Sequence, residues 1–105
     1  MPRNDRVLAG APAGVLRFQE AFAAPSRVAV LRQLMTQSMT FAALHSAIGE
    51  AQARPTVYTA LNELITMGYV VDDEPGPRKR KTTLFSAKRT MVLEDMAATL
   101  VYLAG

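Results

Sequence analysis

The fold is decided by residues 54–88, which read R-P-T-V-Y-T-A-L-N-E-L-I-T-M-G-Y-V-V-D-D-E-P-G-P-R-K-R-K-T-T-L-F-S-A-K. Pro55 stands in the first turn of a helical pattern, where a helix tolerates proline best, and Gly68 supplies a left-handed stop. The apolar residues between them share one helix face: Val57, Leu61, Leu64 and Ile65. We therefore predict a helix over residues 54–67 with one apolar side and one polar side.

Two segments that favour β-structure follow this helix. Residues 69–73 and residues 81 or 82 to 87 are rich in strand-forming side chains, and the Pro-Gly-Pro at 75–77 is incompatible with a helix. We expect the two segments to pair as a hairpin. Its loop precedes an unbroken cationic run: Arg78, Lys79, Arg80 and Lys81.

Earlier parts of the chain predict three more helices. Apolar side chains recur at helical spacing in three segments: 15–23, 26–35 and 41–48. Ser26 and Thr40 are suitable N-cap residues for the second and third of these helices, and Gly49 can end the third. A polar linker at residues 50–53 then leads into the helix that begins at residue 54.

Length and composition fit a single globular domain. The chain has 105 residues, of which 50% are hydrophobic and 20% are charged, a balance typical of folded domains. No apolar run approaches the roughly 20 residues that span a bilayer. We expect a mostly helical α+β fold with a flexible N-terminal arm (1–14), a domain over 15–87 and a C-terminal helical segment (88–105).

Few side chains are available for catalysis or metal binding. Cysteine is absent, which excludes thiolate ligands, and Ser46 points elsewhere on a helix than its neighbour His45, the only imidazole. Asp72, Asp73 and Glu74 would alternate between strand faces and balance the cationic run rather than collect a cation. We therefore expect no enzyme, no cofactor and no metal site. The N-terminus lacks a signal-peptide pattern, so we expect a cytoplasmic protein.

Charge and polar patterning favour a nucleic-acid partner. The net charge is only +3, but four of the twelve basic residues form the run at 78–81. The polar side of the 54–67 helix carries side chains that can reach phosphates and base edges in a major groove. Taken alone, each feature fits a plain solvated surface. Together with the short helix at 41–48, they favour a helix-turn-helix that binds DNA.

The motifs in their order resemble a known superfamily. They read S-R-V-A-V-L-R-Q-L-M, M-T-F-A-A-L-H-S-A-I-G, R-P-T-V-Y-T-A-L-N-E-L-I-T-M-G-Y-V and G-P-R-K-R-K-T-T-L-F-S-A-K. Over residues 26–103 the chain is similar to winged-helix regulators of the MarR, ArsR and PadR type. The resemblance implies a winged helix-turn-helix with a two-stranded β wing and a C-terminal dimerisation helix. It also implies a homodimeric transcription factor, usually a repressor.

Residue by residue, the resemblance implies two sets of contacts to double-stranded DNA. A recognition helix at 54–67 enters the major groove through Arg54, Thr56, Tyr58, Thr59 and Asn62. A basic wing at 75–81 lies on the backbone or in the minor groove through Arg78, Lys79, Arg80 and Lys81. Metal-sensing members use cysteines or clustered histidines, which this chain lacks. A small-molecule effector would leave no motif of its own.

The C-terminal segment indicates self-association. In residues 88–103, apolar side chains cover a wider arc than one small core uses. We expect a dimer seam there, joined by the helix at 15–23; packing against the chain's own domain is the other interpretation. The expected seam residues are Val15, Phe18, Phe22, Val92, Met96, Leu100 and Leu103. Two-fold symmetry would place the recognition helices about 34 Å apart, on an imperfect inverted repeat.

Two other functions use the same fold. Some winged-helix domains have lost DNA binding and act as protein-interaction modules in larger assemblies, because a fold does not settle a function. A protein that binds repeated DNA sites for plasmid or phage maintenance would use the same surface as a transcription regulator.

Overall fold

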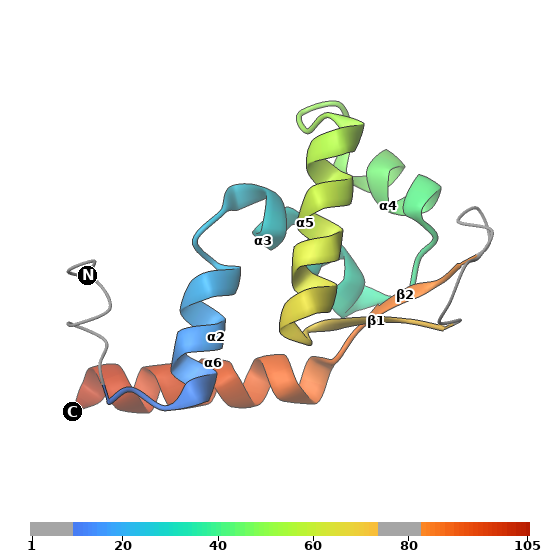
Figure 1. Ribbon diagram of the computed structural model, residues 1–105. Helices are drawn as coiled ribbons and strands as arrows, with labels where there is room; N and C mark the ends of the chain where they lie inside the picture. Colours follow the sequence, from blue (N-terminus) through green and yellow to red (C-terminus); the bar gives the residue numbers. More distant parts are fainter. Residues whose placement is uncertain (1–9, 74–82) are drawn as a thin grey trace.

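The computed structural model describes residues 10–73 and 83–105. Within them, five helices and one antiparallel strand pair form a mostly helical α+β domain (Figure 1), which confirms the expected mostly helical α+β class. The helices are α2 (Ala13–Ala21), α3 (Pro25–Thr36), α4 (Phe41–Ile48), α5 (Arg54–Met67) and α6 (Arg89–Ala104). The strands are β1 (Val70–Asp72) and β2 (Phe85–Ala87).

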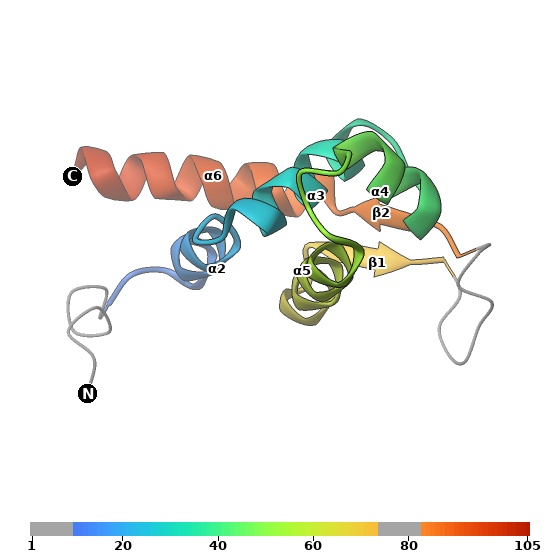
Figure 2. The ribbon, with the colours of Figure 1, turned by 90° about the horizontal axis from the view of Figure 1, so that it is seen from above.

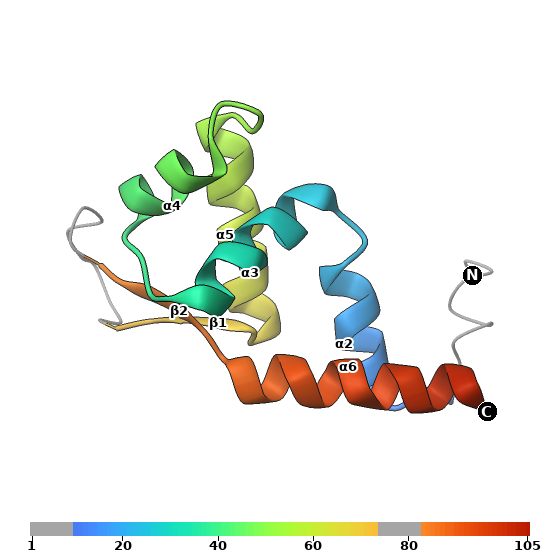
Figure 3. The same ribbon diagram turned by 180° about the vertical axis from the view of Figure 1, so that it is seen from behind.

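Three helices and the strand pair enclose the core. α3 crosses behind α5 in Figure 1 and lies in front of it in Figure 3, while α4 lies on the other side of α5 from α2. The apolar sides of all three helices point inward, as their spacing predicts. The largest fully buried side chains are Val30, Leu44, Val57, Leu61, Leu64, Tyr69 and Val70.

Local signals set the ends of α4 and α5. The Thr40 hydroxyl oxygen accepts a hydrogen bond from the Ala43 amide at 3.2 Å, which satisfies one of the free N–H groups at the start of α4. Gly49 and Gly68 follow the two helices with φ of 86° and 93°, in the left-handed region that other residues rarely adopt. The predicted cap of α4 and the predicted glycine ends of both helices are confirmed.

The predicted Ser26 cap is wrong. α3 begins at Pro25, one residue earlier, with Ala24 in the cap position and no side-chain cap hydrogen bond. Proline has φ fixed near the helical value and no N–H to satisfy, so it starts the helix itself. α2 likewise begins at Ala13 rather than at Val15.

The sheet has two short strands, and a third backbone segment bonds to one of them. β1 and β2 pair antiparallel, with Val71 opposite Ser86. Met39, in the connection between α3 and α4, adds an isolated bridge to Phe85 through two backbone hydrogen bonds of 2.8 and 3.1 Å. This bridge attaches the start of α4 to the strand pair.

α6 and α2 pack together at one side of the core, to which Ala21 and Val92 contribute. Figure 2, seen from above, looks along α5 and shows α6 extending away from the three-helix core, with α2 beside it. Gly14 lets the two helices approach, because a Cβ there would collide with the Asp95 carboxylate. Of the helices that the structure describes, none has the length and apolar character that crossing a membrane requires.

Candidate nucleic-acid interface

The outer face of α5 is polar and exposed. Thr56, Thr59, Asn62 and Thr66 are all exposed, whereas Tyr58 is half-buried at the side of this face. The helix keeps them in place because its other side is anchored by fully buried residues. The expected recognition residues of this helix therefore lie on one accessible surface, with Arg54 at its N-terminal edge.

An aromatic group covers the junction between α4 and α5. The Arg54 guanidinium lies over the Phe41 ring, 5.0 Å from its centroid, which is within cation–π range. Tyr58 meets the same ring edge-on at a centroid distance of 5.7 Å, and His45 stacks on it at 6.3 Å. The contacts among these four side chains hold the N-terminal parts of α4 and α5 together.

Two further hydrogen bonds order this part of the face. The Asn62 side-chain amide donates to the Tyr58 carbonyl oxygen at 3.0 Å, one turn back along α5. The His45 ring nitrogen Nε2 lies 3.2 Å from the Gln52 carbonyl oxygen, which ties α4 to the linker at 49–53. The turn between the two helices is thus held by the His45 side chain.

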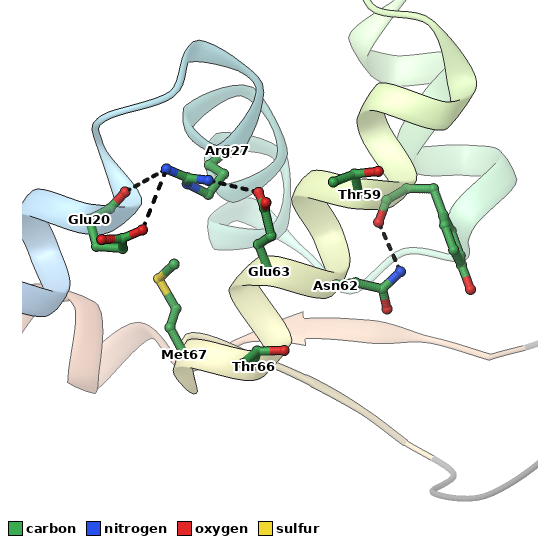
Figure 4. A pocket seen from close by; sticks show the side chains of 8 residues that line it. Glu20, Arg27, Thr59, Asn62, Glu63, Thr66 and Met67 are labelled. Atoms are coloured by element: carbon green, nitrogen blue, oxygen red, sulfur yellow. Dashed lines mark hydrogen bonds and ion pairs between the residues drawn. The ribbon is translucent and has the colours of Figure 1, made fainter.

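A groove separates the outer face of α5 from α2 and α3 (Figure 4). It has a volume of about 490 Å³, and Arg27 of α3 lies at one wall between Glu20 and Glu63. The Arg27 guanidinium donates to the Glu63 carboxylate at 2.7 Å and to the Glu20 carbonyl oxygen at 3.0 Å. The acidic charge of Glu63 is therefore balanced within the protein.

Arg27 was not among the residues expected at this surface. Its side chain is only 13% exposed, and it lies one turn before the buried Val30 and Leu31. A cation three and four positions before core residues on a predicted helix is a signal that it points partly inward. Its contact with Glu63, in contrast, joins residues 36 positions apart and has no local pattern.

The expected wing contacts lie outside the described residues. β1 ends at Asp72 and β2 begins at Phe85, so the cationic run belongs to the connection between them. At the described end of this connection, the Asp73 carboxylate accepts a hydrogen bond from the Leu84 amide at 3.1 Å. This acid closes the strand pair, a role that the sequence did not indicate.

The expected dimer residues fall into two groups. Val15 and Val92 are buried within the chain itself, so one copy does not present them to another. Phe18 is half-buried and stacks on Phe22 at a centroid distance of 4.3 Å. The remaining expected residues are exposed: Phe22, Met96, Leu100 and Leu103. Leu93, Val101 and Tyr102 extend this apolar surface along α6.

A buried carboxylate fixes α6 against the end of α5. Asp95, which is 6% exposed, accepts two hydrogen bonds from the Arg17 guanidinium, at 2.9 and 3.0 Å. It accepts a third from the Tyr69 hydroxyl at 2.7 Å. Tyr69 follows α5 directly after Gly68, and its carbonyl oxygen accepts from the Lys88 amide at 2.8 Å. Three parts of the chain therefore meet at one side chain.

This cluster changes the acidity of its members. Burial alone would raise the pKa of Asp95. The hydrogen bonds from Arg17 and Tyr69 lower it by more than burial raises it, so the pKa lies below its ordinary value. Burial and the bond to Asp95 together raise the pKa of Tyr69 well above its ordinary value. The hydrogen bond to Asp95 also raises the pKa of Arg17. At neutral pH the carboxylate is charged and the phenol is neutral.

The described surface holds no cluster of metal-ligand side chains. In residues 10–73 and 83–105, no three His, Cys, Asp or Glu side chains come together as metal ligands could. What the surface offers is an exposed helix face of hydroxyls and an amide, edged by an arginine on an aromatic ring. No protein-family model and no curated protein matches the chain.

Proposed function

We propose that the protein binds double-stranded DNA at specific sites as a homodimeric transcriptional regulator of the repressor type. The observation that carries the proposal is the outer face of α5, where exposed hydrogen-bonding side chains stand together without an apolar cover. Such side chains position a protein on phosphates and read base edges when a helix lies in the major groove. The readers would be Thr59 and Asn62, with Arg54 and Thr56 at the leading edge.

The order of elements supports a winged helix-turn-helix. α4 and α5 are joined by residues 49–53, and α5 is followed at once by an antiparallel strand pair. The Met39 bridge adds a third backbone segment to that pair, ahead of α4. In this arrangement α5 is the recognition helix and the connection between β1 and β2 is the wing.

Electrostatics support the same assignment. The Glu63 carboxylate, which would repel phosphates, is paired with Arg27. The cationic run of the proposed wing would add phosphate contacts. These contacts would give affinity and register, while the recognition helix would give sequence discrimination.

The exposed apolar residues of α6 support the homodimer. Leu100 and Leu103 are 63% and 74% exposed, and exposed apolar side chains grouped at one end of a helix favour an interaction site. A two-fold axis through α6 would present two copies of α5 to one DNA duplex, about one helical turn or 34 Å apart. The same apolar residues favour the second candidate function, a winged-helix module that binds another protein.

The test is binding of the purified protein to random-sequence duplex DNA over a range of salt concentrations. The logarithm of the binding constant should fall with the logarithm of salt, by about 0.9 for each phosphate contact. Selection of the bound fraction should then enrich an inverted repeat. Absence of binding at low salt would reject the proposal and favour the protein-interaction module.

One pair of variants tests the wing within the same assay. Arg78→Ala should reduce the salt slope by roughly 0.9 per subunit, because one phosphate contact is lost. Arg32→Ala on α3 is the matched control, since it removes the same charge from an exposed position outside the proposed interface. Equal effects of the two variants would show that net charge alone, rather than a wing contact, controls binding.

A further inference from the structure

Phe41 occupies an unusual position for an aromatic residue at the start of a helix. It is the first residue of α4, and it is only partly buried, with one side packed against the hydrophobic core. Its remaining surface contacts Arg54, the first residue of α5. The ring therefore lies between the core and a cation at the edge of the proposed DNA-binding face.

The contact restricts a side chain that would otherwise be mobile. An exposed arginine loses considerable rotamer freedom when it binds a ligand. Among the described residues, Arg54 forms no ion pair that would hold its guanidinium. The contact with the Phe41 ring therefore restrains this side chain. Tyr58 and His45 in turn hold the ring from two sides.

We propose that Phe41 is a positioning residue, which holds the Arg54 guanidinium ready for its contact with DNA. The inference rests on the proposed function and adds to it a residue of α4 that touches no DNA itself. Its effect acts through Arg54 alone: the ring lowers the cost of ordering that side chain. Removal of the ring therefore weakens DNA binding only when Arg54 is present.

A double-mutant cycle on the full chain tests this dependence. The variants are Phe41→Leu, Arg54→Ala and the two combined, each assayed for binding to the selected duplex, or to random duplex at low salt. Leucine keeps an apolar side chain against the core but offers no π face. Phe41→Leu should weaken binding about two- to fivefold when Arg54 is present, the range of an exposed cation–π contact, and should have no effect on Arg54→Ala.

Two controls separate positioning from a loss of packing. Phe41→Tyr keeps the ring and should bind like the unchanged protein. Ile48→Val, at the other end of α4, also trims a partly buried core side chain and should act equally with and without Arg54. Thermal unfolding of each variant shows how much folded protein enters the assay.

The outcomes distinguish this inference from the function on which it rests. A loss confined to proteins that contain Arg54 supports positioning. An equal loss from Phe41→Leu in both backgrounds, or no loss in either, overturns the inference while DNA binding stands. If the unchanged protein binds no DNA, both the proposed function and the inference fail.

Discussion

The outer face of α5 and the junction of α2 with α6 use polar side chains differently. On α5, Thr59 and Asn62 are exposed, and the Asn62 side chain donates a hydrogen bond to the Tyr58 carbonyl oxygen of its own helix. At the junction, Asp95 is buried and accepts three hydrogen bonds from Arg17 and Tyr69. Polar groups that are fully bonded inside the protein fix its shape, whereas those left at the surface are available to a ligand.

Apolar side chains are distributed the other way, buried on α5 and exposed on α6. The core-facing side of α5 is fully buried, but the C-terminal half of α6 exposes Leu100, Val101 and Leu103. One side of the molecule thus offers hydrogen-bonding groups and the other offers hydrophobic surface. Asp95 connects the two sides, because it accepts a hydrogen bond from Tyr69, two residues after the end of α5.

The largest effect is expected on the apolar side. Leu100→Asp should convert the proposed dimer into monomers, because it removes a leucine from each copy and adds two like charges. Burial of a leucine contributes about 1.5–3 kcal/mol, so two copies would lose at least roughly twice that. Sedimentation over a range of protein concentrations measures the change.

The matched control is Glu94→Ala, which alters an exposed polar residue of the same helix and should leave the oligomeric state unchanged. An intact Leu100→Asp dimer would place the interface elsewhere. Monomers in the unchanged protein would remove the apolar surface of α6 from the dimer proposal altogether.

The next effect is expected at the junction. Asp95→Ala should reduce the free energy of unfolding by about 2–3 kcal/mol, since the Tyr69 hydroxyl is left buried without its acceptor and Arg17 loses its partner. The cost stays below that of a fully buried pair because the Arg17 side chain is 33% exposed and regains water. Chemical denaturation measures it, and a loss below about 0.5 kcal/mol, typical of surface changes, would contradict it.

Acid should weaken the same junction. The pKa of Asp95 is lowered by folding, so its stabilisation is present above the ordinary carboxyl pKa of about 3.9 and is lost as pH falls through the folded value. The pKa of Tyr69 is raised by folding. The stabilisation that its neutral phenol contributes is therefore present below the ordinary tyrosine pKa of about 10, and it is lost as pH rises through the folded value. Asp95→Asn should therefore flatten the acid limb of the stability profile relative to the unchanged chain.

The sequence predicted the helices of the core well because their signals are local. Thr40 caps α4, and Gly49 and Gly68 end α4 and α5, as expected from residue type and spacing. The polar side of α5 followed from the same periodicity. The start of α3 was misplaced because two adjacent residues, Pro25 and Ser26, both suit a helix start, and the fixed φ of proline was decisive.

The interactions that join these helices could not be predicted in the same way. Arg17, Tyr69 and Asp95 are separated by up to 78 positions, and no spacing rule connects them. One signal was available: Asp95 shares a helix face with Val92, three positions earlier, and a charge within an apolar stripe needs a partner. The identity of that partner required the packing of α2 on α6.

The smallest effect is expected on the face of α5. Asn62→Ala should lose discrimination at one base pair of the selected site, because Asn pairs with adenine through two hydrogen bonds. In the free protein its amide nitrogen already donates to the Tyr58 carbonyl oxygen. Breaking that hydrogen bond offsets part of the free energy gained from the contact with adenine. We therefore expect about 1 kcal/mol, the low end for such a pair.

Competition binding between the selected duplex and single-base variants measures this loss. Gln19→Ala, which removes an exposed amide from α2, should change no base preference. Because Asn62 is exposed, the free energy of unfolding should stay within about 0.5 kcal/mol of the unchanged protein, in contrast to Asp95→Ala. A uniform loss over all sequences would make Asn62 a backbone contact and leave Thr59 as the reader, since a phosphate contact positions the protein without selecting a base.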